Sequence, residues 1–101
     1  MLQDYYYKKL VKRIRDWLVY QGIGIIKENR YCYIFDMSAE HIVLPKNMEF
    51  GYVQIYFVQF TTKKITEEYY YKGPFWHNPY EEFTKRVKQK QFENIAHYDE
   101  I

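Results

Sequence analysis

The spacing of apolar residues changes twice along this chain, and the two changes limit what it can fold into. Over residues 5–20, apolar side chains recur every three to four positions, as they do along one face of a helix. Between residues 23 and 72 they tend to alternate, which is the pattern of strands with one buried face. Over residues 79–95 the helical spacing returns. We therefore predict an α+β fold in a single domain, residues 1–101, with an antiparallel sheet flanked by an N-terminal and a C-terminal amphipathic helix.

The sheet is expected to hold four to five strands, one of them short and closed off by a proline. The predicted strands cover residues 23–27, 31–37, 41–44, 51–60 and 64–72. The strand over 51–60 has the clearest alternation, and its expected core-facing side chains are Val53, Ile55 and Phe57. On the last strand, Ile65, Tyr69 and Tyr71 are expected to share one face and to alternate with Thr66, Glu68 and Tyr70.

Residues with strong capping and turn preferences stand at the ends of the predicted elements. Asp4 is the expected N-cap of the first helix, and Gly22 follows its end, where a left-handed backbone conformation favours glycine. Asn29 is expected in the turn between the first two strands. Asn78, with Glu81 three residues later, predicts a helix start with a capping box.

Aromatic residues make up 22% of the chain, and a domain of this size cannot bury all of them. Their density is highest over residues 67–83, a stretch interrupted by glycine and proline. Tyrosine also favours strands, so part of the surplus serves only to cover the sheet. Exposed rings nevertheless suit protein interfaces, including those of homodimers. The side chains predicted to contact a partner protein are Tyr70, Phe75, Trp76 and Tyr80.

The net charge is only +2, but residues 1–21 alone carry five cations and two anions. The cations of this segment are Lys8, Lys9, Lys12, Arg13 and Arg15. A charged helix face often serves only to keep a helix solvated. Cations beside the tyrosines at positions 5–7 would also suit phosphates and unpaired bases. Nucleic-acid binding through this basic face is therefore the alternative to protein binding.

Residues that would support catalysis are sparse. One cysteine and three scattered histidines give no zinc-ligand spacing, and no glycine-rich phosphate loop is present. Cys32 lies in the apolar run "RYCYIF" and is expected to be buried and unreactive. Asp36, Glu40 and Glu68 are expected to be solvated carboxylates. We expect no enzymatic activity, no metal, no cofactor and no small-molecule substrate.

The chain opens with a polar segment unlike a signal peptide, and its longest apolar run is too short to cross a membrane. A single cysteine suits a reducing compartment. We therefore expect a soluble, cytoplasmic protein without a membrane partner.

Runs of tyrosine, lysine and isoleucine recur through the chain, as in "YYYKK", "YCYIF" and "EEYYYKG". In this the chain resembles the small orphan proteins of viruses that infect hyperthermophilic archaea. The resemblance implies a thermostable protein of the host cytoplasm, monomeric or dimeric, that acts by binding. It assigns no functional residue. A protein of a bacterial phage with an AT-rich genome would share the same features.

Overall fold

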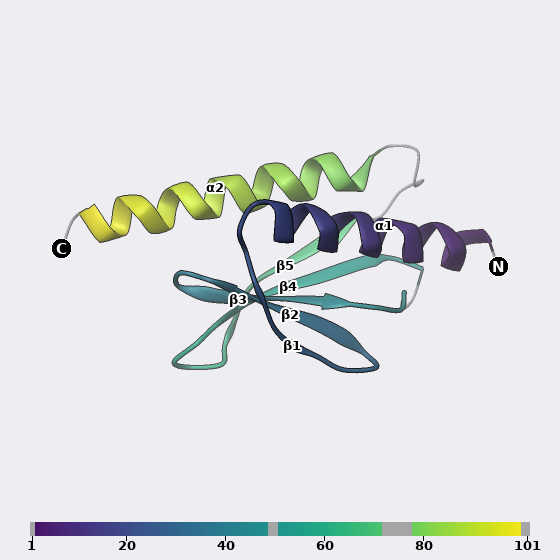
Figure 1. The fold of residues 1–101 in the computed structure, drawn as a ribbon, viewed down its shortest axis with the longest axis horizontal. Helices are drawn as coiled ribbons and strands as arrows, with labels where there is room; N and C mark the ends of the chain where they lie inside the picture. The colour runs from purple at the N-terminus through teal and green to yellow at the C-terminus, as the bar shows by residue number, and fades with distance from the viewer. Residues whose placement is uncertain (1, 49–50, 72–77, 100–101) are drawn as a thin grey trace.

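The computed structural model describes residues 2–48, 51–71 and 78–99, which form five strands between two helices (Figure 1). The helices are α1 (Leu2–Tyr20) and α2 (Pro79–Asp99). The strands are β1 (Ile25–Glu28), β2 (Cys32–Met37), β3 (Glu40–Pro45), β4 (Val53–Gln59) and β5 (Ile65–Tyr71). They form one sheet in chain order, with antiparallel neighbours throughout. The predicted α+β class is confirmed.

The ends of all five strands lie within two residues of their predicted positions, but both helices are longer than predicted. Helix α1 begins at Leu2, so the prediction of Asp4 as the N-cap is wrong. Asp4 instead lies in the first turn, where a carboxylate also interacts favourably with the helix dipole. An aspartate near a helix start therefore gives the same sequence signal whether it is the N-cap or a first-turn residue. Helix α2 runs on to Asp99 because no glycine or proline interrupts residues 80–99.

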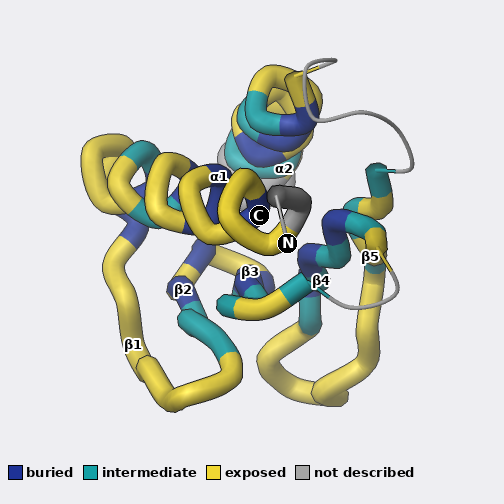
Figure 2. Tube along the Cα trace, turned by 90° about the vertical axis from the view of Figure 1, so that its right-hand side faces the viewer, coloured by how far each residue is buried: buried dark blue, intermediate teal, exposed yellow. Residues whose placement is uncertain are grey.

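Both helices lie on the same face of the sheet, and Figure 2 shows buried residues concentrated between the two layers. On β2, β3 and β4 every second side chain points into this core, as period-two alternation requires. The predicted inner residues Val53, Ile55 and Phe57 are indeed buried. The helices contribute a second group of buried side chains: Tyr7, Leu10, Val11, Ile14, Leu18, Phe83 and Val87.

Helix α2 is fastened to the sheet by aromatic contacts near its start. The ring of Phe83 stacks on Phe57 of β4 at 6.2 Å between centroids and meets Tyr69 of β5 edge-on at 5.4 Å. The Tyr69 hydroxyl donates a hydrogen bond of 2.7 Å to the carbonyl of Pro79. These contacts fix the position of the first turn of α2 over β4 and β5.

Charged side chains hold the middle of α2 to the same strands. Lys90 forms ion pairs with Glu40 of β3 and Glu67 of β5, and Arg86 also pairs with Glu67. Thr66 donates to the Glu40 carboxylate at 2.7 Å, so this nearly buried acid has a cation and a hydroxyl as partners. A buried carboxylate with such partners avoids the cost of desolvating an unpaired charge.

Strand β5 carries a bulge that changes which of its side chains face the helices. Phe57 lies opposite Glu67, whereas its neighbour Val58 lies opposite Ile65, so Thr66 is an extra residue in the ladder. The bulge turns Ile65 away from the core, and 54% of its surface is exposed. The prediction that Ile65 shares one face with Tyr69 and Tyr71 is therefore wrong, because it assumed unbroken alternation.

The predicted turn and cap residues otherwise act as expected. Gly22 follows α1 with a φ of 84°, in the left-handed region. The side-chain oxygen of Asn29 accepts hydrogen bonds from the backbone N–H groups of Tyr31 and Cys32. Asn78 accepts from the N–H of Glu81 at 3.3 Å, and its amide donates to the Glu81 carboxylate at 3.0 Å.

Candidate interaction surfaces

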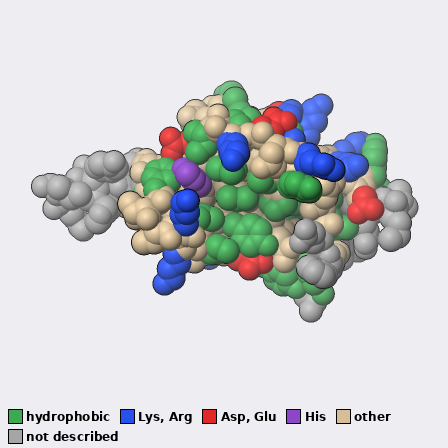
Figure 3. Space-filling view, turned by 90° about the horizontal axis from the view of Figure 1, so that it is seen from below, with side chains coloured by type: hydrophobic (Ala, Val, Ile, Leu, Met, Phe, Trp, Pro, Cys, Tyr) green, Lys and Arg blue, Asp and Glu red, His purple; other side chains and the backbone are tan. Residues whose placement is uncertain are grey.

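The side of the sheet opposite the helices forms a broad surface, which we call the open face. It consists of the outward side chains of the five strands, which are Lys27, Cys32, Ile34, Asp36, His41, Val43, Pro45, Gln54, Tyr56, Val58, Ile65, Glu68 and Tyr70. Figure 3 looks onto this side and shows hydrophobic side chains gathered in the middle, with charged ones mostly toward the margins. In the described part of the chain, no helix lies over it.

One row of the open face runs straight across all five strands. Lys27 lies opposite Ile34, Ile34 opposite Val43, Val43 opposite Tyr56, and Tyr56 opposite Glu68. We call these five residues the central row. Directly opposed side chains on one face are close neighbours, so the row is a continuous line of contacts. It begins with a cation on β1, is apolar or aromatic over β2 to β4, and ends with an anion on β5.

Aromatic pairs flank the central row. The rings of Tyr52 and Tyr70 lie 5.0 Å apart beside β4 and β5, and His41 and Phe60 lie 4.0 Å apart, edge to face. Tyr70 keeps 46% of its surface exposed and Phe60 keeps 37%. Rings held by neighbours in this way are already ordered, so they lose little side-chain entropy when a partner contacts them.

A small pocket of about 220 Å³ lies at one end of the open face. Its lining is mainly aromatic and includes Tyr31, Tyr52 and Tyr56, together with Cys32 and Gln54. An apolar hollow with a few polar groups at its edge is the usual receptor for an anchoring side chain of a protein partner. We refer to it as the tyrosine pocket.

Of the four residues predicted to contact a protein, the two that the structure describes lie on different surfaces. Tyr70 belongs to the open face. Tyr80 lies in the helix layer, where its ring meets Trp17 edge-on at 6.4 Å and carries the Arg13 guanidinium at 3.8 Å. Tyr80 thus joins α2 to α1. Phe75 and Trp76 lie outside the described residues.

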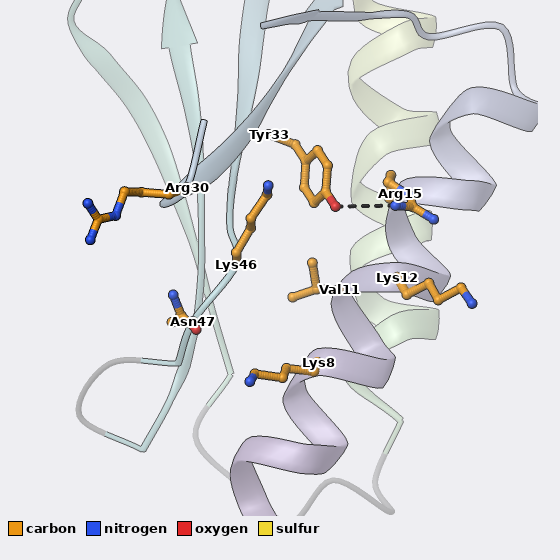
Figure 4. A pocket seen from close by; sticks show the side chains of 8 residues that line it. All are labelled: Lys8, Val11, Lys12, Arg15, Arg30, Tyr33, Lys46 and Asn47. Carbon is orange, nitrogen blue, oxygen red and sulfur yellow. Dashed lines mark hydrogen bonds between the residues drawn. The ribbon is translucent and has the colours of Figure 1, made fainter. Parts of the chain in front are cut away.

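A second candidate surface is a groove of about 530 Å³ that opens between α1 and the sheet beneath it (Figure 4). Its cations come from three segments that are distant in the sequence, and we call it the basic groove. They are Lys8, Lys12, Arg15, Arg30 and Lys46. Val11 and Tyr33 line the groove between them, and no Asp or Glu is among the lining residues that the structure describes.

Two of the groove cations are partly engaged by neighbouring acids. Arg15 pairs with Asp16 at 3.0 Å and donates to the Tyr33 hydroxyl at 3.2 Å. These hydrogen bonds, with Asp16 the larger influence, raise the pKa of Arg15 further above its already high value. Lys46 pairs with Glu28 at 2.7 Å while its ammonium lies 4.5 Å from the Tyr33 ring centroid. These two acids offset part of the positive charge of the groove, and Arg15 and Lys46 both lie over the ring of Tyr33.

The basic residues predicted on α1 divide into two groups. Lys8, Lys12 and Arg15 line the basic groove. Arg13 instead covers Tyr80, and Lys9 lies 4.5 Å from the ring of Tyr5. A hydrogen bond with Tyr5 raises the pKa of Lys9. The helical period explains the division, since positions 8, 12 and 15 share a face that positions 9 and 13 do not.

Two features of these surfaces could not be predicted from the sequence alone. Arg30 and Lys46 join the groove only through the folding of the β1–β2 turn and the end of β3 against α1. The central row depends on strand register, which alternation in single strands does not give. The signal that could have indicated the open face is the second apolar side of β2, β3 and β4, with Ile34, Val43 and Tyr56.

Two expectations about single residues differ from the structure. Cys32 is half-buried on the open face, not fully buried as expected. Of the three carboxylates expected to be solvated, Glu40 is nearly buried on the covered face, whereas Asp36 and Glu68 lie on the open face. No group of three His, Cys, Asp or Glu side chains in the described residues could hold a metal ion. Neither described helix has a stretch apolar and long enough to span a membrane.

Comparison with known proteins gives no match to a family model, to a curated protein or to a solved structure.

Proposed function

We propose that this protein is a non-enzymatic binding protein that contacts another protein through the open face of its sheet. The observation that carries the proposal is the apolar and aromatic middle of that face, from Ile34 on β2 through Val43 to Tyr56 on β4. Half-buried strand residues of this kind would gain further burial from a partner. Large contiguous apolar patches are uncommon on the surface of soluble monomers, and they often mark interaction sites.

The tyrosine pocket supports the same proposal at the level of one side chain. A protein partner that inserts an apolar or aromatic residue would meet Tyr31, Tyr52 and Tyr56 at once. Tyrosine gives a large contact area for few rotatable bonds, and hot spots of protein interfaces are rich in it. Gln54 would supply a hydrogen bond that fixes the orientation of the inserted group.

The proposal is tested by capture of protein partners from cells that produce this chain. We expect the tagged wild type to retain a defined partner and Tyr70→Glu to retain at least about tenfold less, since an unpaired charge buried against a partner is strongly unfavourable. Tyr20→Glu is the matched control, because Tyr20 is 85% exposed on α1, away from the open face. Equal capture by all three proteins would refute the assignment of the open face.

We infer a second candidate function, nucleic-acid binding through the basic groove. The specific observation is that, in the described part of the chain, five cations from three segments line one groove and no acid lines it with them. Since cations occupy the Tyr33 ring, recognition there would rest on phosphate charge, not on stacking of bases.

Fluorescence anisotropy with labelled single- and double-stranded DNA across a salt series tests this second function. We expect affinity to fall steeply with salt, and to be lost when Lys8→Glu and Lys12→Glu are combined. Lys9→Glu makes a matched single change on the same helix outside the groove and should weaken binding less than Lys8→Glu alone. Equal effects of Lys8→Glu and Lys9→Glu would exclude the groove as the site.

A further inference from the structure

We propose that the partner of the open face is a second copy of this chain, packed face to face around a twofold axis parallel to the strands. This inference rests on the proposed function of the open face. The observation behind the dimer is the order of residues in the central row. When a second copy of the row is rotated by half a turn about its middle, the cation of each copy faces the anion of the other. The row has one cation, one anion and an apolar middle, and β3 lies at its centre.

The twofold axis passes over Val43 and reverses the order of strands in the second copy. Strand β1 of one protomer then lies on β5 of the other, and β2 lies on β4. Val43 meets Val43, and Ile34 meets Tyr56. Lys27 at one edge meets Glu68 at the other, so each dimer contains two such charge pairs.

Charge also excludes the other twofold arrangement within the interface plane. An axis perpendicular to the strands would place Lys27 of the central row against Lys27 of the second copy, and Glu68 against Glu68. Like charges in direct opposition are destabilising, whereas opposite charges at an interface rim favour one register. Stacked sheets rotate by about 30° relative to each other because of their twist. The long lysine side chain can span the offset that this rotation produces at the sheet edge.

The size of the open face is consistent with a dimer of modest affinity. Five strands spaced about 4.8 Å apart, with about six residues each at about 3.3 Å, project to roughly 450 Å². The corrugated side-chain surface is larger than its projection, which brings the contact near the lower end of stable interfaces. Gln54 donates to Glu68 at 3.3 Å, so the acid at the edge is already oriented. We therefore expect a dissociation constant in the micromolar range.

Sedimentation velocity over micromolar to millimolar concentrations, with a charge swap, tests this inference. We expect the wild type to shift from monomer to dimer. Lys27→Glu or Glu68→Lys alone should raise the dimer Kd about tenfold, because each change converts two attractive pairs into repulsive ones. The double variant Lys27→Glu/Glu68→Lys should restore the wild-type Kd. Lys88→Glu, an exposed change of the same charge on α2, should leave it unaltered.

The outcomes distinguish this inference from the function on which it rests. A monomeric wild type that still captures a different protein through the open face would overturn the dimer and leave the proposed function standing. A dimer whose Kd does not respond to the single charge changes, or is not restored by the double change, would overturn the proposed register. A monomer that captures nothing through the open face would overturn both.

Discussion

The ammonium group of Lys90 lies 3.2 Å from a carboxylate oxygen of Glu40, across the layer boundary between α2 and β3. It also lies 3.0 Å from Glu67 and 4.6 Å from the ring centroid of Phe57. Only 13% of the Lys90 side chain and 9% of the Glu40 side chain are exposed. Lys90 thus pairs with two acids that face the helix layer, with Arg86 as the second cation on Glu67, and these ion pairs fix where α2 lies on the sheet.

Replacement of Lys90 by alanine is therefore expected to destabilise the fold by about 2 kcal/mol, because Glu40 loses its charged partner in a nearly buried position. Urea unfolding followed by circular dichroism measures the change. Lys88→Ala removes an exposed lysine from the same helix and should cost less than about 0.5 kcal/mol. If the two variants unfold at the same urea concentration, the ion pairs contribute nothing to stability.

Tyr69 is expected to make stability fall in alkaline solution. Burial, reinforced by the nearby Glu82, raises the pKa of Tyr69 above its ordinary value of 10.0. Its hydroxyl therefore stays protonated in the folded state at a pH where the unfolded chain ionises. The stability that this group contributes is complete below about pH 10 and is lost as the pH rises above it.

The variant Tyr69→Phe isolates this effect. At neutral pH it should be about 1 kcal/mol less stable than the wild type, because the hydrogen bond to Pro79 is missing. The difference should shrink as the pH rises beyond about 10, since phenylalanine does not ionise. Urea midpoints at neutral and alkaline pH give the comparison, with Tyr20→Phe as the exposed control. A constant difference at all pH values would show that Tyr69 titrates normally.

Asn78 combines a helix cap with a left-handed backbone, since its φ is 64°. Asn78→Ala should lower stability by about 1–2 kcal/mol, because it removes the cap and leaves a left-handed backbone without the polar side chain that lets asparagine tolerate it. Asn78→Gly loses the cap but relieves the strain, so it should cost less. Thermal unfolding of the two variants ranks them, and equal melting temperatures would contradict the left-handed conformation.

Much of the fold could be predicted from the sequence because its local signals agree with the tertiary structure. The alternation in β4 buries Val53, Ile55 and Phe57, as expected, since both helices lie over one face of the sheet. The exceptions are local. Ile65 points outward because the extra residue Thr66 changes the phase of β5, and no residue type marks a bulge by itself.

The candidate surfaces were less predictable than the fold, because each depends on contacts between distant segments. Tyr80 has the exposure and size expected of a binding residue, yet Arg13 and Trp17 engage it within the chain. Conversely, Val43 is an ordinary strand valine until register places it at the centre of a row that neither described helix covers. Composition indicated surplus aromatic surface, and only the topology determines where that surface lies.

The central claim is that the open face binds protein, and site-specific photo-crosslinking tests it most directly. A benzoylphenylalanine at position 70 replaces an exposed tyrosine of the open face, and the same group at position 20 replaces an exposed tyrosine of α1. After irradiation in cells that produce the protein, mass spectrometry identifies the adducts. We predict a defined protein adduct, with a second copy of this chain as the leading candidate, from position 70 and none from position 20. No adduct from position 70, or the same adducts from both positions, would contradict the claim.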